Sequence, residues 1–292
     1  MLPVSVVIPT RDRPAQLHDA IESMLAGECV PAEIVVADQS TGPMRPLPGA
    51  GGEVDVRRVH LATPGLSRGR NAGLAAARHD LIVFADDDVV ADPQWLCRMV
   101  GALEDSPPRT AISGAVLDDG GGAGFVPSTT RRTEPETFTG RQFGDPLFAG
   151  NMAIRRAAFG ELGMFDERLG AGAEFPGSED NDFGFRLLEA GWAIRFVPDA
   201  VVRHRGARHG RELLRLDWAY ARGQGAFYAK HRRASDRFML RRFGRNARFR
   251  LGRMRTAPRM VRGDMTAVRE LVYLAGLVTG ALAWTRRHGR GR

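Results

Sequence analysis

The stretch Leu81–Val90 constrains this chain most, because five apolar residues run directly into three aspartates, Asp86, Asp87 and Asp88. The apolar half is mostly β-branched or aromatic, which is typical of a strand buried on both faces of a parallel sheet. The aspartates follow its carboxyl end, where open α/β sheets bind their ligands. Because adjacent carboxylates repel one another, the cluster indicates either a divalent cation, which prefers hard oxygen ligands, or a solvated turn that caps the next helix.

Strand patterns and helical patterns alternate along most of the chain, and this alternation indicates βαβ units. We therefore expect an α/β fold with a Rossmann-like, mostly parallel sheet flanked by helices. The expected strands are 4–8, 33–37, 54–61, 81–85, 111–117, 148–154, 194–197 and 201–204, and the expected helices begin near residues 14, 64, 93 and 179. The segment 118–146, rich in Gly, Thr, Arg and Pro, is expected to be a long loop of the kind that acts as an active-site lid.

Charge divides the chain into two regions. Residues 1–200 carry a net charge of −11, from 18 basic and 29 acidic side chains, whereas residues 201–292 carry +19, from 24 and 5. We expect a catalytic domain at 1–205 and an Arg-rich helical region at 206–292. Such a basic region favours a polyanionic partner. Because it lacks the interleaved aromatic residues that stack on bases, we expect an anionic membrane surface and no nucleic acid.

The basic region contains an apolar segment, 271–284, with arginines on both sides. It is shorter than the roughly 20 residues that a membrane-spanning helix needs. Two interpretations remain open, an interfacial helix lying on a membrane and a core helix packed on the protein.

The two cysteines, Cys29 and Cys97, form neither a disulfide framework nor a CxxC metal pair. Their apolar or helical surroundings predict buried free thiols. The chain also enters its first strand without a charged leader. These features indicate a reducing, cytoplasmic location.

Other polar residues fall where a parallel sheet would bring them to the same edge. Asp38 ends the second expected strand, where a carboxylate can accept hydrogen bonds from a base or ribose, or merely cap the strand. Arg70 and Asn71 lie near a Gly-flanked helix N-terminus, which favours anions. Glu179 and Asp180 begin a helix, where the helix dipole alone also favours acids. The coincidence of all three signals with the aspartate triplet favours a ligand site.

Four motifs together resemble family 2 glycosyltransferases of the GT-A fold. They are Val-Ser-Val-Val-Ile-Pro-Thr-Arg-Asp-Arg-Pro at 4–14, Ser-Arg-Gly-Arg-Asn-Ala-Gly-Leu at 67–74, Phe-Ala-Asp-Asp-Asp at 84–88 and Ser-Glu-Asp at 178–180. The resemblance covers about residues 3–205. It implies transfer of a sugar, with inversion, from a nucleoside-diphosphate sugar to an acceptor hydroxyl.

The resemblance also implies roles for individual residues. Asp86 and Asp88 match the motif that holds ribose or sugar and a Mg²⁺ or Mn²⁺ ion, and Asp180 matches the general base. His204 would be a further metal ligand, unless it is an ordinary structural histidine. Residues expected on the donor side are Thr10, Arg11, Asp38, Arg70, Asn71 and Asp86. Residues expected on the acceptor side are Gly150, Asn151 and Glu179.

The basic region and the resemblance together favour a lipid-linked or cell-envelope acceptor, reached from the cytoplasmic face of a membrane. Two other functions stay open on the residues alone. A nucleotidyltransferase that forms nucleotide sugars would need a Gly-rich phosphate loop after the first strand, and Pro9–Arg13 contains no glycine. A non-enzymatic basic adaptor for membrane or nucleic acid would leave the acidic cluster without a role.

Overall fold

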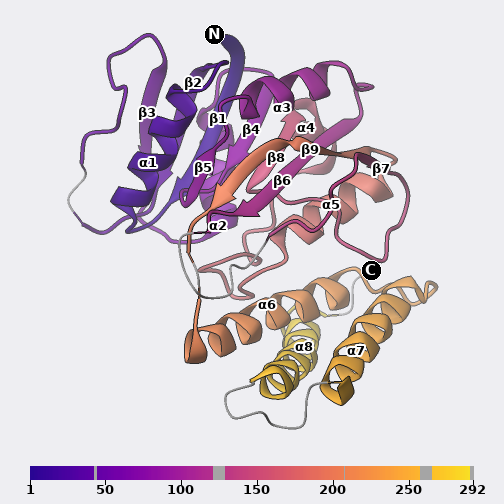
Figure 1. Cartoon of the computed structure of the whole chain (residues 1–292). Coiled ribbons are helices and arrows are strands. Elements are labelled where there is room, and N and C mark those ends of the chain that lie inside the picture. Colours follow the sequence, from indigo (N-terminus) through magenta and orange to yellow (C-terminus); the bar gives the residue numbers. More distant parts are fainter. Residues whose placement is uncertain (43–44, 121–128, 207, 257–264, 290–292) are drawn as a thin grey trace. The chain divides into compact units, whose positions relative to one another are not determined.

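The chain folds into two compact units (Figure 1). The computed structural model describes residues 1–42, 45–120, 129–206, 208–256 and 265–289. The first unit comprises Met1–Glu167 and Asp180–Ala207, and the second comprises Arg168–Glu179 and Arg208–Arg292. This division differs from the expected boundary near residue 205 in one respect, because the segment Arg168–Glu179 belongs with the C-terminal helices.

A nine-stranded sheet forms the centre of the first unit. Its strands are β1 (Leu2–Thr10), β2 (Pro31–Asp38), β3 (Asp55–His60), β4 (Leu81–Ala85), β5 (Val89–Ala91), β6 (Thr110–Asp118), β7 (Glu136–Phe138), β8 (Asn151–Arg155) and β9 (Ala193–His204). Their order is β3-β2-β1-β4-β8-β6-β9-β5, and β7 pairs with β9. Strands β1 to β4 and the pair β6–β9 are parallel, whereas β5, β7 and β8 pair antiparallel. The expected α/β fold is confirmed, and the sheet is mixed because β5, β7 and β8 are antiparallel to their neighbours.

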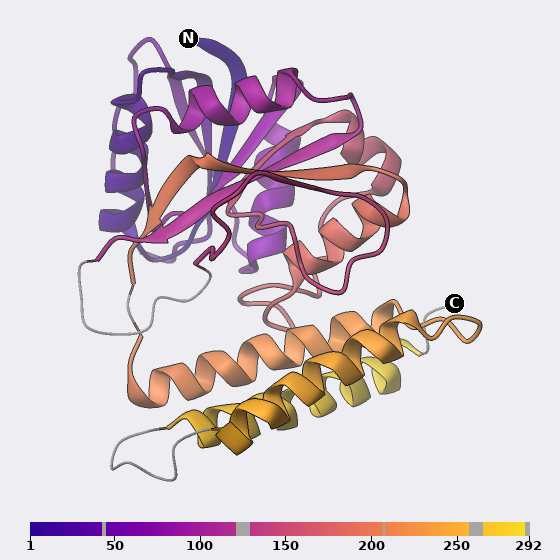
Figure 2. The same ribbon diagram turned by 45° about the vertical axis from the view of Figure 1, so that its right-hand side comes forward.

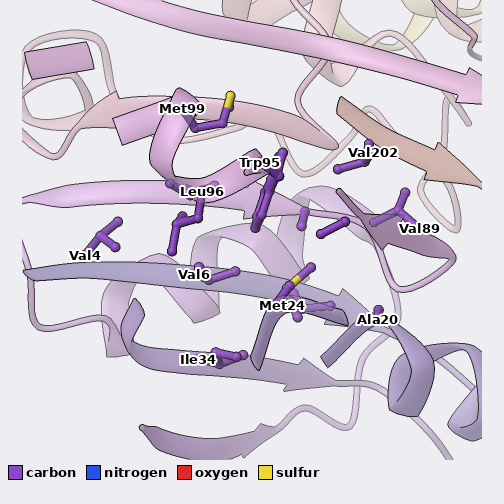
Figure 3. Close-up of a cluster of buried hydrophobic side chains, with 14 of the residues drawn as sticks. Val4, Val6, Ala20, Met24, Ile34, Val89, Trp95, Leu96, Met99 and Val202 are labelled. Carbon is purple, nitrogen blue, oxygen red and sulfur yellow. The ribbon is translucent and has the colours of Figure 1, made fainter. Parts of the chain in front are cut away.

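Helices cover both faces of this sheet. Alternating side chains of β1 separate the two cores, with Val4 and Val6 on one face and Val7 on the other. The first face packs against α1 (Pro14–Leu25) and α3 (Trp95–Glu104), and Figure 3 shows Met24 and Trp95, from these two helices, in the same cluster of buried side chains. The opposite face packs against α2 (Leu66–Ala76), α4 (Ala157–Leu162) and α5 (Glu179–Glu189).

The later strands differ most from the expectation. The two strands expected at 194–197 and 201–204 are one strand, β9, whose pairing with β6 shifts register between Gly114 and Ala115. Neither β5 nor β7 was expected. The proposed lid at 118–146 contains β7, and its residues 121–128 lie outside the described part of the chain.

The prediction of free cysteines is wrong, because Cys29 and Cys97 form a disulfide. Cys29 follows α1 and Cys97 lies on α3. The backbone N–H of Glu28 donates to the carbonyl of Pro93 over 2.8 Å, which brings the two segments together. The bond joins residues 68 positions apart, so it restricts the unfolded chain. It also removes the support that free thiols gave to a reducing location.

The second unit contains α6 (Gly210–Lys230), α7 (Phe238–Thr256) and α8 (Thr266–His288), which lie side by side (Figure 2). The backbones of α6 and α8 touch, because a Cβ at Gly225 would overlap the carbonyl of Leu277 and a Cβ at Gly280 would overlap that of Arg222. In the described part of the chain, α8 alone is long and apolar enough to cross a membrane by length and composition. The apolar segment therefore lies in a 23-residue helix that buries one face within the unit.

One buried carboxylate, Glu33, joins three elements of the first unit. Its side chain accepts hydrogen bonds from the hydroxyl of Ser5, from Nη2 of Arg57 at 2.8 Å and from Nε of Arg78 at 3.1 Å. Burial raises the pKa of Glu33, but hydrogen bonds from Ser5, from the backbone of Arg78 and from Arg57 outweigh it and lower this pKa to about 2.

Because the folded pKa of Glu33 lies below its usual value, its ionised form stabilises the fold above about pH 4.5, and this stabilisation is lost as the pH falls toward 2. We expect Glu33→Gln to lower the free energy of unfolding by about 3 kcal/mol at pH 7. Urea unfolding of both proteins at pH 7, 4 and 3 would measure the difference. A difference that stays constant over this range would contradict the assigned role.

Candidate functional site

The aspartate triplet forms the turn between β4 and β5. β4 is held between β1 and β8, and β5 pairs with β9 so that Val89 lies opposite His204. The backbone N–H of Arg205 also donates to the carbonyl of Asp88 over 2.9 Å. The sheet therefore fixes both ends of the turn and places three carboxylates at the carboxyl end of β4.

Asp86 lies between α2 and the start of β8. Nη2 of the buried Arg70 donates to its Oδ1 over 2.9 Å, and the side chain of Asp86 remains 21% exposed. α2 can approach β1 this closely because Gly73 has no side chain, and a Cβ at this position would overlap Val7. On the other side, a Cβ at Gly150 would overlap the carboxylate of Asp86. The absence of side chains at two glycines thus leaves room for this ion pair.

Asp87 points into the protein and ties the triplet to β1. It accepts hydrogen bonds from Oγ1 of Thr10 at 2.6 Å and from Nη1 of Arg13 at 3.2 Å. Burial raises the pKa of Asp87 to about 6, against the hydrogen bond from Thr10 and with the help of the negative charge of Asp88. Its buried, fully engaged carboxylate fits a structural role.

Asp88 faces two basic groups. Its Oδ2 accepts a hydrogen bond from Nη1 of Arg13 at 2.7 Å, and its Oδ1 lies 3.4 Å from Nε2 of His204. Burial raises the pKa of Asp88, the negative charge of Asp86 raises it further, and His204 and Arg13 oppose both. Burial therefore destabilises the ionised form of Asp88, and the positive charge of Arg13 beside it stabilises that form.

Asp86, Asp88 and His204 offer two carboxylates and one imidazole, a donor set that suits Mg²⁺ or Mn²⁺. Nδ1 of His204 is buried and has no hydrogen-bond partner among the described residues. Within these residues the three groups do not bring their ligand atoms within 4.8 Å of one another, whereas the exposed His18, Asp19 and Glu22 do. The site therefore fits a cation in its chemistry, and Arg13 occupies part of the space around Asp88.

A cavity of about 260 Å³ lies beside the triplet, between β1, β2, β3 and α1. Thr10 lines this cavity and also contacts Asp87, so it joins the two parts of the site. Asp38 lies in the cavity wall, where its Oδ1 accepts the backbone N–H of Ser40 at 2.9 Å and its Oδ2 lies 3.0 Å from Nε of Arg58. The lining residues are Thr10, Asp12, Pro14, Leu17, His18, Asp38, Ser40, Gly42, Arg45, Pro46, Leu47, Pro48 and Arg58.

Asp12, a non-glycine residue with φ of +55°, links two segments of the cavity rim by hydrogen bonds. Its backbone N–H donates to Oγ of Ser40 over 2.8 Å, and its carboxylate accepts the N–H of Thr41 over 3.1 Å. A left-handed backbone is unfavourable for most side chains but tolerated by Asp, which bonds locally. Arg11, expected near the nucleotide, is exposed, pairs with Asp12 at 3.4 Å and does not line the cavity.

Asp180 lies in the first turn of α5, and its Oδ1 accepts the N–H of Asn181 over 2.8 Å. Phe183, one turn further on, packs against Phe165, whose ring centre lies 4.7 Å away. Phe165 in turn contacts Phe84 at 5.5 Å, two residues before the triplet. Aromatic packing thus links the start of α5 to the end of β4.

Asn71 lies next to Arg70 on α2, but its amide binds the backbone of Phe165. Nδ2 donates to the carbonyl over 2.9 Å and Oδ1 accepts the N–H over 3.0 Å. The ring of Phe165 lies 5.6 Å from the guanidinium carbon of Arg70. Asn71 therefore holds the backbone of Phe165, the residue against which Arg70 packs, and its donor contact stays a prediction.

Asn151, expected on the acceptor side, is instead fully buried in the core. Its Oδ1 accepts the indole N–H of Trp95 at 2.8 Å, and its Nδ2 donates to the carbonyls of Ala115 and Ala200 at 2.9 and 3.0 Å. The amide of Asn151 therefore binds backbone carbonyls of β6 and β9 near the register shift between these strands. Its assignment to the acceptor side stays a prediction.

Residues 5–163 match the model of the family described as glycosyl transferase family 2. The chain belongs to this family. It is 26% identical over 248 residues to the glucosyl-dolichyl phosphate glucuronosyltransferase of Haloferax volcanii, covering 78% of this chain and 76% of that protein. It is 30% identical over 210 residues to the pre-mycofactocin glycosyltransferase of Mycobacterium tuberculosis, covering 69% of this chain and 42% of that protein.

Solved structures show the same fold. The mannosyltransferase PcManGT of Pyrobaculum calidifontis, in complex with GDP-Man and Mn²⁺, matches with a TM-score of 0.62 at 14% identity, over 96% of this chain and 87% of that one. Residues 1–349 of Staphylococcus aureus TarS match with a TM-score of 0.54 at 13% identity, over 98% and 92%. The fold of this glycosyltransferase is therefore GT-A.

Three residues of this family 2 glycosyltransferase contact the site but were not predicted to do so. Arg13 lies within the first motif, and its position beside an acidic cluster was a signal that could have been used. Arg58 and Phe165 gave no such signal, because each resembles an ordinary residue of its strand or loop until the chain is folded.

We expect Arg13→Met to strengthen Mn²⁺ binding about tenfold in the absence of nucleotide, because the guanidinium that competes for Asp88 is removed. Titration followed by electron paramagnetic resonance would measure the affinity. Arg11→Met, which removes an exposed arginine two residues away, is the matched control. Unchanged or weaker Mn²⁺ binding in Arg13→Met would refute the competition.

Proposed function

We propose that this glycosyltransferase moves a sugar, with inversion, from a nucleoside-diphosphate donor to a hydroxyl of a lipid-linked or cell-envelope acceptor at a membrane. The observation that carries the proposal is the joining of an acidic turn to a base-sized cavity through one residue, Thr10. The cavity suits the nucleoside, and the turn beside it suits the cation and diphosphate. A nucleotide sugar needs both parts.

The donor side is assigned from these contacts. Thr10 and Asp38 serve the nucleoside, and Asp86 and Asp88, with His204, would hold Mg²⁺ or Mn²⁺. Such a cation neutralises charge that develops on the diphosphate leaving group. Arg70 is buried against Asp86 and Phe165, so it supplies a fixed positive charge and keeps the carboxylate oriented.

Asp180 is assigned as the general base. A carboxylate in the first turn of a helix is favoured by the helix dipole. It would take the proton of the acceptor hydroxyl as that oxygen attacks C1 of the sugar in line with the leaving diphosphate. Glu179 begins the same helix and is assigned to the acceptor side, whereas the buried Asp182 is engaged by Nε of Arg186 at 3.0 Å.

The named acceptor of one relative supports a lipid-linked acceptor. The Haloferax volcanii protein acts, by its name, on a glucosyl-dolichyl phosphate. An enzyme for such an acceptor must work at a membrane, and we place this glycosyltransferase on the cytoplasmic face.

The second unit offers a surface suited to anionic lipid. On α7, Arg241, Arg245, Arg248 and Arg255 are exposed, and their spacings of four, three and seven put them on one face. The exposed Leu240, Phe249 and Leu251 flank this face. In a row of this kind, the guanidinium groups can bind lipid phosphates while the flanking apolar side chains enter the acyl-chain region of the bilayer.

α8 adds an exposed apolar stripe in the same unit. One side of the helix is packed against α6. The opposite side carries four exposed apolar residues, Val268, Leu271, Val278 and Leu282. An exposed apolar stripe of this kind costs free energy in water. A bilayer surface is the occupant that suits both the stripe and the arginines of α7.

We expect Asp180→Asn to lower kcat by a factor of about 10² to 10⁴ while the Kd of the nucleotide stays within twofold, because the amide cannot take a proton. Calorimetric titration of nucleoside diphosphates with Mn²⁺, together with a donor-hydrolysis or transfer assay, separates the two effects. Asp199→Asn, at an exposed position of β9, is the control. Loss of nucleotide binding in Asp180→Asn would rule out a role confined to proton transfer.

We expect the full-length protein to bind vesicles containing anionic phospholipid and to bind purely zwitterionic vesicles less. Each surface arginine contributes about 1 kcal/mol, so Arg241→Gln with Arg248→Gln should weaken binding about thirtyfold. Vesicle flotation measures this, and the control is Arg131→Gln with Arg132→Gln, which makes the same charge change in the first unit. Equal effects of the two double variants, or no binding by the unaltered protein, would exclude this surface.

A further inference from the structure

We propose that Gln224 on α6 is a positioning residue for Asp180, acting through a hydrogen bond to Ser178, two residues before Asp180 in the chain. This bond keeps the backbone of Ser178 in a left-handed conformation, and that conformation sets the direction in which the chain enters α5. The inference rests on the proposed role of Asp180 as general base and names a residue that determines where this base lies.

The chain that leads into α5 is fixed by the second unit. The segment Arg168–Glu179 belongs to this unit, and the chain passes into the first unit at Asp180. The backbone N–H of Gly170 donates to the carbonyl of Phe175 over 3.0 Å, and the N–H of Phe175 donates to that of Arg168 over 2.9 Å. An apolar cluster holds the segment in place, and its buried members are Leu169, Phe175, Ala226, Ala229 and Trp284.

The end of this segment touches the backbone of α6. A Cβ at Gly223 would lie 2.5 Å from the carbonyl oxygen of Gly177 and 2.8 Å from its Cα. Gly177 itself has φ of +134°, a conformation that residues with side chains rarely adopt. Because both positions lack a side chain, the segment approaches α6 closely enough for the next residue, Ser178, to reach Gln224.

The side chains of Ser178 and Gln224 meet in a buried environment. Oγ of Ser178 donates to Oε1 of Gln224 over 3.0 Å, and the two residues are 9% and 5% exposed. A buried hydroxyl that loses its acceptor costs more free energy than an exposed one, because water does not replace the partner. The bond therefore holds the side chain of Ser178 in one place.

Ser178 has an unfavourable backbone conformation. Its φ is +64°, and among the residues that the structure describes only Asp12 and Ser178 are non-glycine residues with positive φ. Such a conformation persists where surrounding contacts impose it, and it clusters at functional sites. The residue before a helix usually has an extended backbone instead. If Ser178 relaxed toward that state, the chain would enter α5 in a different direction.

The position of Asp180 depends on this direction. Oδ1 of Asp180 accepts the N–H of Asn181 over 2.8 Å, so the carboxylate follows the first turn of α5. A general base must lie within hydrogen-bond reach of its proton, and a misplacement of about 1 Å lowers the rate about 10²-fold. The strands β1, β2 and β4, which carry the proposed donor site, lie elsewhere in the chain. Loss of Gln224 should therefore lower kcat and leave nucleotide binding intact.

The first test is hydrogen exchange, followed by mass spectrometry, on the full-length Gln224→Met protein. This variant keeps a side chain of similar length and removes the acceptor. Peptides covering 176–184 should exchange at least fivefold faster than in the unaltered protein, and peptides covering β1 and α3 should not change.

Asn246→Leu is the matched control for exchange, because it removes an amide that hydrogen-bonds to the hydroxyl of Tyr228 over 3.1 Å in the same unit. It should leave the exchange of 176–184 unchanged. Unchanged exchange of these peptides in Gln224→Met, or an equal increase in both variants, would overturn the inference.

The second test measures the nucleoside diphosphate released by hydrolysis of UDP-glucose, UDP-N-acetylglucosamine and GDP-mannose with Mn²⁺. Water gives a proton to Asp180 and its oxygen bonds to C1 of the sugar, while the bond from C1 to the diphosphate breaks and leaves its electron pair on the diphosphate. Gln224→Met should lower kcat tenfold or more and keep the Kd of the nucleoside diphosphate within twofold. Equal losses in kcat and in nucleotide affinity would show a merely structural residue and refute the assignment.

Substitutions at Ser178 show whether Gln224 acts through this backbone. Ser178→Ala should lower kcat about as much as Gln224→Met, because it removes the other partner of the same bond. Glycine adopts a left-handed backbone without a penalty. Adding Ser178→Gly to Gln224→Met should therefore raise kcat at least threefold above that of Gln224→Met alone, and no such rescue would contradict the mechanism.

The outcomes separate this inference from the proposed function. If Asp180→Asn lowers kcat and Gln224→Met does not, the base stands and the positioning role of Gln224 is overturned. If Asp180→Asn keeps full activity, both are overturned. If the unaltered protein hydrolyses none of the three nucleotide sugars, the result contradicts the proposed function, and the exchange of 176–184 decides whether Gln224 holds the start of α5.

Discussion

The structure of the first unit depends on holding three adjacent carboxylates at the end of a buried strand. Two like charges about 4 Å apart repel by roughly 4 kcal/mol at the effective dielectric constant of a protein surface. Groups from separate parts of the chain offset this repulsion: Arg13 and Thr10 near the end of β1, Arg70 on α2 and His204 at the end of β9. The triplet is therefore the point at which these elements are joined.

Close approach of backbones is the second constraint, and glycine makes it possible in both units. Gly73 lets α2 approach β1 and so brings Arg70 to Asp86, and Gly150 leaves space for the carboxylate itself. In the second unit, Gly225 and Gly280 allow α6 and α8 to touch. A Cβ at Gly73 would overlap Val7 and one at Gly150 would overlap the carboxylate of Asp86, whereas a Cβ at Gly225 or Gly280 would overlap the backbone of the facing helix.

The sequence predicted the parts of the fold that local pattern determines. Apolar runs such as Leu81–Ala85 identified the central strands, the end of the second strand located Asp38, and the motifs located Arg70 and the triplet. Pattern alone could not give strand direction, so the strand expected at 148–154 was found but its antiparallel pairing was not. The three-residue strands β5 and β7 are too short to show a pattern and were missed. It also could not distinguish an amide that faces a ligand from one that satisfies the core, as Asn151 does, or show that Cys29 and Cys97 meet. The place of Arg58 in the site could not be predicted for the same reason, because it depends on contact with Asp38 on the neighbouring strand.

The central claim is that the triplet holds the cation and diphosphate of a sugar donor. Anomalous diffraction at the manganese edge, from crystals grown with Mn²⁺ and a nucleoside diphosphate, tests it directly. We expect a manganese peak between the diphosphate and the carboxylates of Asp86 and Asp88, with the base in the cavity lined by Asp38. A nucleotide bound in that cavity with no manganese at the triplet, or with manganese only at His18, Asp19 and Glu22, would contradict the account.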